Sequence, residues 1–201
     1  MYSKEVREFA STLFFKSPSA YHYVRKFLQL PGVSTIGSWL SNHGCYPGFT
    51  NEAFTELESR INSCDIDDCD KYRYCTIMID EMSMKKNVQW DRVAGRFVGY
   101  VDMGFDEDST EEASKALVVL AVGLIGRWKI PLGYFFSNGL RAVTVANIVR
   151  ETLTRLHNIS VIGVAVTFDG AQNQICSIEL LGASFSPHRP RPYFLILQTL
   201  H

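Results

Sequence analysis

The feature that most constrains this fold is an amphipathic helix that leads into a wholly apolar run. Residues 143–157 repeat apolar side chains at helical spacing, which predicts a helix with one apolar stripe. Residues 161–168 are Val-Ile-Gly-Val-Ala-Val-Thr-Phe, and such a run predicts a strand buried on both faces. A helix leading into such a strand is typical of a crossover between parallel strands. The pattern therefore predicts an α/β sheet.

Further strands are expected before this helix, because the apolar spacing there has the shorter period of a strand. The predicted strands cover residues 72–82, 95–104, 117–124 and 130–136. Their closeness along the chain favours antiparallel pairing as a meander, and the crossover then adds the later strand parallel to one of them. Residues 171–181 predict a helix after that strand.

Residues 1–62 have a different pattern, with short helical segments separated by tight turns. Ser34 and Asn51 are expected to cap two of these helices. Such a series fits a helix-turn-helix-like subdomain and a plain helical subdomain equally well. The predicted organisation continues with an acidic linker at 63–70, an α/β domain at 71–185 and a tail of different composition at 186–201.

Composition sets further limits on the class of protein. The chain has 201 residues, of which 46% are hydrophobic and 20% charged, as expected for a globular protein. Its net charge of −1 gives no sign of a nucleic-acid partner. Five irregularly spaced cysteines predict reduced thiols rather than a disulfide framework or a zinc site. The longest apolar run, residues 116–126, is too short to span a bilayer, and the charged first residues do not resemble a signal peptide.

Two carboxylates stand out by position. Asp80 lies near the end of the first predicted strand, and Asp169 directly follows the apolar run. If these strands are parallel neighbours, both acids emerge at the same sheet edge, where α/β sheets bind ligands. Mg²⁺ is the natural cation for oxygen ligands beside phosphate, and a pair of such ions supports phosphodiester cleavage. The alternative is that each acid forms a turn or caps a helix.

Other charged residues are weaker candidates. Glu81 should face away from Asp80 on the same strand, which favours a structural role. Glu179, on the predicted helix after Asp169, is a third acid for which ordinary surface placement is the simpler interpretation. Asp102 is an alternative strand-end carboxylate. Residues 127–129, Arg-Trp-Lys, fit either a nucleic-acid contact or a surface turn between strands.

Together the motifs resemble the THAP-domain-containing, P-element-type DNA transposases, from the N-terminus to about residue 185. The segments that carry this resemblance are Leu13-Phe-Phe-x-Ser-Pro-x-Ala-Tyr21, Leu30-Pro31, Ser34-Thr-Ile36, Trp39, Ile77-x-Ile-Asp-Glu-Met82, Val98-Gly-Tyr-Val-Asp-x-Gly104, Trp128-Lys-x-Pro131, Gly133-Tyr-Phe-Phe136 and Phe168-Asp-Gly170. Each motif is short, but their number and order make the resemblance specific.

The resemblance implies a helix-turn-helix segment followed by an RNase H-like mixed sheet with flanking helices. It also implies Mg²⁺- or Mn²⁺-dependent cleavage and transfer of DNA in the nucleus. The metal-binding acids of the family fall on Asp80 and Asp169. DNA is then the expected partner and a membrane is not, while the oligomeric state stays open, with a homo-oligomer as one alternative.

The chain departs from the family in two respects. No zinc-binding Cys-Cys-Cys-His module precedes Tyr2, and the region of the nucleotide-binding insertion and the final catalytic Glu is not reached. The tail from Ser186 onward does not resemble the family. We therefore expect a fragment of a transposase catalytic core that is inactive alone. The alternative is a domesticated, non-catalytic module that binds DNA or protein.

Overall fold

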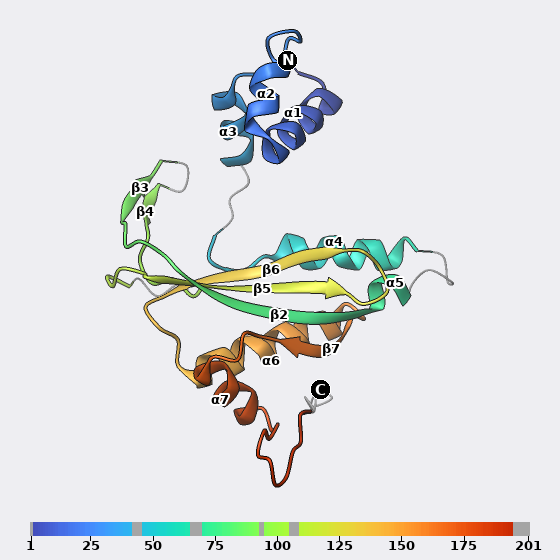
Figure 1. Ribbon diagram of the computed structural model, residues 1–201, viewed down its shortest axis with the longest axis vertical. Coiled ribbons are helices and arrows are strands. Elements are labelled where there is room, and N and C mark those ends of the chain that lie inside the picture. The colour runs from blue at the N-terminus through green and yellow to red at the C-terminus, as the bar shows by residue number, and fades with distance from the viewer. Residues whose placement is uncertain (1, 42–45, 65–69, 93–94, 105–108, 195–201) are drawn as a thin grey trace. The chain divides into compact units, whose positions relative to one another are not determined.

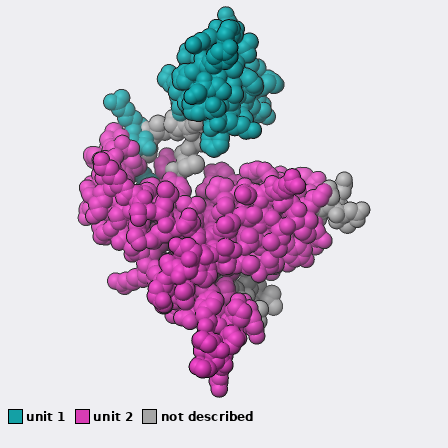
Figure 2. All heavy atoms as spheres, in the orientation of Figure 1, with its two compact units in different colours: residues 1–45, 91–96 teal, residues 46–90, 97–201 magenta. Residues whose placement is uncertain are grey.

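The computed structural model describes residues 2–41, 46–64, 70–92, 95–104 and 109–194. The chain divides into two compact units (Figure 2). One comprises residues 1–45 and 91–96, and the other residues 46–90 and 97–201. The first is helical and the second contains the main sheet, so each is described by itself.

The helical unit contains α1 (Lys4–Lys16), α2 (Pro18–Val24) and α3 (Val33–Ser41). Serine side chains cap the first two helices: Ser3 accepts a hydrogen bond from the backbone N–H of Val6, and Ser17 accepts one from that of Ala20. Pro18 occupies the first turn of α2, where its missing N–H is harmless. Ser17 and Pro18 therefore mark the boundary between α1 and α2, which follow one another directly.

A small core holds the three helices together. Ala10, Tyr21 and Ile36, one from each helix, are fully buried. The Tyr21 hydroxyl donates a 2.6 Å hydrogen bond to the carbonyl of Pro31, which satisfies its buried polar group. The ring of Phe14 meets the Tyr21 ring edge to face at 5.5 Å. The helical unit therefore has a core of its own.

The second unit is built on a five-stranded sheet (Figure 1). Its strands lie in the order β1-β6-β5-β2-β7. Their bounds are β1 Gly48–Phe49, β2 Tyr74–Ser83, β5 Lys115–Gly123, β6 Lys129–Ser137 and β7 Ile162–Thr167. The helices of this unit are α4 Asn51–Asn62, α5 Asp70–Arg73, α6 Ala142–Asn158 and α7 Gln172–Leu180. A separate two-stranded ribbon joins β3 (Gln89–Asp91) to β4 (Arg96–Val98).

The topology confirms the predicted meander and crossover. Strands β2, β5 and β6 pair antiparallel in sequence order. Helix α6 then carries the chain back across the sheet, so that β7 pairs parallel to β2. Gly163 permits this helix to lie close to the strand, because a Cβ at that position would come within 2.5 Å of a Leu153 methyl group.

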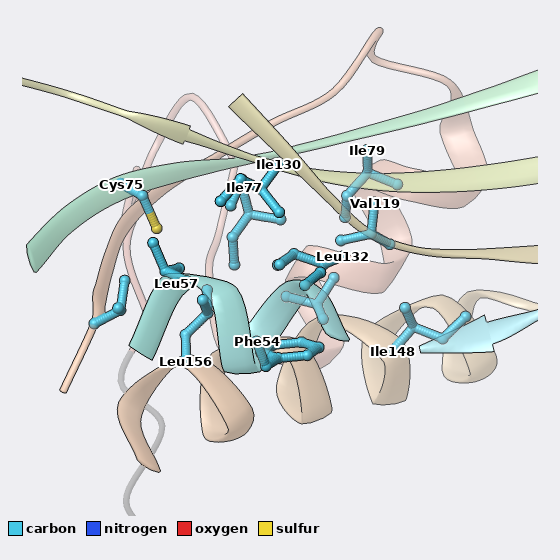
Figure 3. Packing of buried hydrophobic residues seen from close by; sticks show 14 of the residues in the cluster. Phe54, Leu57, Cys75, Ile77, Ile79, Val119, Ile130, Leu132, Ile148 and Leu156 are labelled. Atoms are coloured by element: carbon cyan, nitrogen blue, oxygen red, sulfur yellow. The ribbon is translucent and has the colours of Figure 1, made fainter. Parts of the chain in front are cut away.

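One face of the sheet packs on helices α4 and α6. The alternating residues Cys75, Ile77 and Ile79 of β2 point to this face and are buried. Figure 3 shows Phe54 and Leu57 of α4, with α6 alongside, packed beneath the strands. Leu156 of α6 joins the same cluster. The core of the second unit is therefore a single layer between one sheet face and two helices.

The sequence-based organisation grouped residues 1–62 as one helical subdomain, and the structure differs from it at helix α4. It packs in the sheet core through Phe54 and Leu57, so it belongs to the second unit. Thr50 rather than Asn51 occupies its N-cap position, and Ser34 lies inside α3 rather than ahead of it. The acidic residues at 65, 67 and 68 lie outside the described part of the chain.

The segment 95–104 is not one continuous strand. Only Arg96–Val98 is strand, followed by isolated bridges from Tyr100 to Glu112 and from Asp102 to Phe136. The strand ends before Gly99, which has a φ of 108° and where a Cβ would lie 2.1 Å from the Asn87 carbonyl oxygen. At the end of the segment, Gly104 has a φ of 74°, and a Cβ there would lie 2.4 Å from the Gly48 Cα.

Strand β7 corrects the prediction of a strand buried on both faces. It is the edge strand of the sheet, and Ile162 and Val164 are 44% and 50% exposed. Strand β2 covers one edge of β7, and no strand among the described residues pairs with the other. The apolar run therefore identified the strand correctly but not its surroundings.

Candidate metal-binding site

Asp80 is positioned by the alternation of β2. Its neighbours Ile79 and Glu81 point to the helix-covered face, so Asp80 points to the opposite, outer face with Met78 and Met82. Its side chain is exposed and makes no hydrogen bond or ion pair with the residues that the structure describes. Asp80 therefore offers an exposed carboxylate on the outer face of β2, an interior strand of the sheet.

Asp169 lies just beyond the end of β7, in a turn. Its Oδ1 accepts a 3.0 Å hydrogen bond from the backbone N–H of Ala171, and Gly170 between them has a φ of 85°. An aspartate that binds the backbone two residues ahead is a common turn device. One carboxylate oxygen thus stabilises the turn that leads into α7, and the exposed side chain has a second oxygen for other contacts.

The parallel register brings both acids to the same level of two adjacent strands. The last pair between β2 and β7 joins Met78 to Thr167, and each acid follows two residues later, Asp80 still within β2. The hydroxyl oxygens of Thr76 and Thr167 lie 3.4 Å apart, which shows that their side chains share a sheet face. Sequence reasoning did not single out these threonines, although strand alternation places both beside the acids.

The described residues do not complete a metal site by themselves. Two carboxylates supply oxygen donors of the kind that Mg²⁺ prefers. No cluster of three or more His, Cys, Asp or Glu side chains in the described ranges could hold a metal ion. Glu81 is not available as a third ligand, because it faces the core side and pairs with Lys115 at 2.5 Å. Glu179 is exposed on α7.

Asp102, the alternative strand-end carboxylate, forms a turn. Its Oδ1 accepts a 2.8 Å hydrogen bond from the N–H of Gly104, and its backbone pairs with Phe136. These contacts give Asp102 a structural role in the turn and in the bridge to β6.

Trp128 has a structural role. It is only 6% exposed, stacks on Tyr72, and donates a 2.7 Å hydrogen bond from Nε1 to the carbonyl of Lys71. A ring held in this way is not free to stack on a nucleic-acid base. The arrangement ties α5 to the loop that joins β5 to β6.

Three of the five cysteines lie in the described ranges, and none of these three forms a disulfide bond. They are Cys64, Cys75 and Cys176. Burial raises the pKa of the Cys75 thiol to about 11, so this group stays protonated at neutral pH. Cys45 and Cys69 lie outside the described residues.

The antiparallel meander, the helical crossover and the parallel fourth strand define an RNase H-like domain. The chain belongs to the P-element-type transposase family. Residues 45–182 match the family model described as a TNP-like RNase H N-terminal domain, and residues 1–39 match the helix-turn-helix domain of transposable element P transposase-like proteins.

Comparisons with individual proteins agree with this assignment. The chain is 36% identical over 184 residues to the human DNA transposase THAP9, a match that covers 90% of this chain and 20% of that protein. It also resembles the Drosophila P element transposase strand transfer complex, with a TM-score of 0.66 and 23% identity. That match covers 90% of this chain and 36% of the other. The chain therefore spans only a minor part of each relative.

None of the helices in the described ranges has the length and apolar character that a membrane crossing requires.

Proposed function

We propose that this chain is a fragment of a transposase catalytic core and that Asp80 and Asp169 are two of its metal ligands. The observation that carries the proposal is that each acid lies two residues beyond the last pair between the parallel neighbours β2 and β7. RNase H-like transposases generally use divalent metal ions, and carboxylates at one sheet end suit such ions. A nuclear location is part of the same proposal.

The role of the chain's own residues in this proposal is to hold ligands. Asp80 is held on an interior strand of the sheet, and Asp169 is oriented by the hydrogen bond that it accepts from the Ala171 N–H. Divalent ions bound there would supply activation of an attacking oxygen and stabilisation of a leaving oxygen in phosphodiester cleavage. Because two carboxylates are too few, the remaining ligands come from outside the described residues, and the chain alone is inactive.

The decisive experiment uses a longer polypeptide that joins this chain to the remaining catalytic region of a family member. Metal-dependent nicking of DNA is measured for the unchanged protein and for Asp80→Asn and Asp169→Asn. Each substitution should lower the rate at least about a hundredfold, because the ligand set loses a charge. Glu179→Gln is the matched control and should retain activity. Full activity in Asp80→Asn would contradict the proposal.

A second function, binding of DNA by the helical unit, is favoured by its charge. Residues 1–39 contain five basic and two acidic residues, a net charge of +3, whereas the whole chain has −1. The same residues match the helix-turn-helix family model. The positive charge suits contact with phosphates, so this unit could bind DNA without any catalysis.

Gel-shift titrations of the full chain at several salt concentrations test this second function. Arg25→Gln and Lys26→Gln remove exposed positive charge from the helical unit and should weaken binding to all DNA sequences and flatten the salt dependence. Lys85→Gln, in the second unit, is the control. Equal losses for all three variants would place the binding surface elsewhere.

A further inference from the structure

An exposed turn after α7 presents a serine with the sequence features of a protein kinase substrate. Residues 186–189 are Ser-Pro-His-Arg, and all four are exposed. They form a β-turn in which the Arg189 N–H donates a 3.2 Å hydrogen bond to the carbonyl of Ser186. Proline occupies the second position of this turn, where its fixed φ is favourable. In Figure 1 the chain after α7 forms a loop that projects away from the sheet, so the turn is presented at the surface.

Few contacts hold this turn. Ser184 and Arg191 form an antiparallel bridge with two backbone hydrogen bonds of 2.7 Å, which closes the loop at its base. Within the loop, the bond from Arg189 is the one further backbone–backbone hydrogen bond among the described residues. The Ser186 Oγ makes no hydrogen bond with the described residues. The segment can therefore open and extend into the cleft of an enzyme at small cost, with its hydroxyl available.

The residues after Ser186 have the pattern that proline-directed protein kinases recognise. Proline follows directly, and its lack of an N–H suits a pocket that offers that position no hydrogen-bond acceptor. Arg189 stands three positions after the serine, where a guanidinium can pair with acidic groups of a kinase. Neither Arg189 nor Arg191 forms an ion pair with the described residues. The recognised features are therefore available to a partner.

The chain has one other serine or threonine followed by proline, Ser17-Pro18, and its surroundings differ. The Ser17 Oγ accepts a 3.2 Å hydrogen bond from the Ala20 N–H as the cap of α2, and Pro18 lies in the first turn of that helix. The residue three positions after Ser17 is Ala20, which carries no charge. Since a helix cap cannot extend without unwinding the helix, the structure distinguishes the two serines.

We propose that Ser186 is a phosphorylation site for a proline-directed kinase that requires a basic residue three positions after the serine. The Ser186 Oγ attacks the γ-phosphorus of ATP, and the bond from that phosphorus to the β–γ bridging oxygen breaks. ADP leaves, and the hydroxyl proton passes to an aspartate of the kinase. The product carries a charge of about −1.5 to −2 close in sequence to Arg189 and Arg191, which can pair with it. The proposal does not rest on the metal site, so the two can fail separately.

Labelling of the full chain with ATP and a purified cyclin-dependent kinase tests the site. Intact mass gives the number of phosphates, and tandem mass spectrometry locates them. We expect a single phosphate on Ser186, with Ser17 unmodified, and none in Ser186→Ala. Pro187→Ala and Arg189→Gln should each lower the initial rate at least about tenfold, because each removes one recognised feature. His188→Gln, in the same turn, is the matched control and should keep the rate.

A free peptide with the sequence of residues 182–192 separates recognition of the sequence from access to it. Labelling of the peptide but not of the chain overturns the proposal, because the folded turn then withholds the serine. Absence of labelling in both also overturns it, because the sequence is then not recognised. Equal labelling of Ser17, or labelling that persists in Ser186→Ala, has the same consequence. Circular dichroism of each variant confirms that the substitution leaves the fold intact.

Discussion

Strands β2 and β7 run parallel side by side, yet their surroundings differ. In β2, buried and exposed residues alternate because helices cover one face and strands pair along both edges. Strand β7 is apolar almost throughout, but it lies at the sheet edge with Ile162 and Val164 exposed. An alternating pattern describes a strand whose neighbours are present. The continuous apolar run of β7 predicts that both of its faces are buried, whereas among the described residues Ile162 and Val164 stay exposed.

The largest expected change in the free energy of unfolding comes from substituting a residue on the core side of β2. Ile77 is fully buried between sheet and helices, so Ile77→Ala should lower the free energy of unfolding by about 2–5 kcal/mol. Met78→Ala, on the outer face of the same strand, should lower it by less than about 1 kcal/mol. Urea denaturation followed by circular dichroism measures both. Equal losses would mean that the outer face is also covered in solution.

A pH titration examines the junction of β2 and β7, where Cys75 pairs with Gly163. Burial raises the pKa of the Cys75 thiol from 9.0 to about 11. The folded state therefore keeps a proton that the unfolded state loses. Stability from this group is complete below pH 9 and falls by about 1.4 kcal/mol per pH unit as pH rises toward 11.

Chemical denaturation at several pH values measures this loss. Cys75→Val removes the thiol and should show a shallower decline across the same pH window, while tyrosine and lysine titrations remain common to both proteins. Identical slopes of unfolding free energy against pH for the two proteins would show that the Cys75 thiol is hydrated and that its pKa is not raised.

Substitutions of Asp169 and Asp80 should change the free energy of unfolding by different amounts, because the two side chains make different contacts. Asp169→Ala removes the acceptor of the Ala171 N–H and should lower the free energy of unfolding by about 1 kcal/mol. Asp169→Asn keeps an acceptor oxygen and should lower it by less. Thermal unfolding of the three proteins gives the comparison, and an equal loss in both variants would assign the effect to charge rather than to the turn.

The smallest change in the free energy of unfolding is expected for a substitution of Asp80. Its carboxylate has no partner among the described residues, so Asp80→Asn should change the free energy of unfolding by no more than about 0.5 kcal/mol. The same substitution is expected to abolish nicking in the longer polypeptide. A substitution that abolishes activity but leaves the free energy of unfolding unchanged is expected for a metal ligand. A loss of several kcal/mol would indicate a structural role instead.

Local patterns were sufficient to predict most helices and strands. Helix α6 and strand β2 follow directly from their apolar spacing, and the helix between strands predicted that β7 pairs parallel. The same reasoning predicted that the strands of Asp80 and Asp169 are parallel neighbours, and the register confirms this pairing. Their role as metal ligands stays a prediction.

Tertiary contacts account for what the patterns did not predict. Helix α4 has the same amphipathic spacing as the helices before it, and only its packing on the sheet assigns it to the second unit. The break at residues 99–104 begins at Gly99, where the chain passes too close to the Asn87 carbonyl for a side chain. The two-residue strand β1 is too short to leave a periodic signal.

The setting of Trp128 has a spectroscopic consequence. The chain has three tryptophans, and the structure places them differently: Trp39 in the helical unit, Trp90 exposed on the β3–β4 ribbon, and Trp128 buried against Tyr72. A buried indole emits at shorter wavelength than an exposed one and is shielded from soluble quenchers. Trp128 therefore contributes most to the blue edge of the emission, and Trp39, which is partly buried in the helical unit, contributes less.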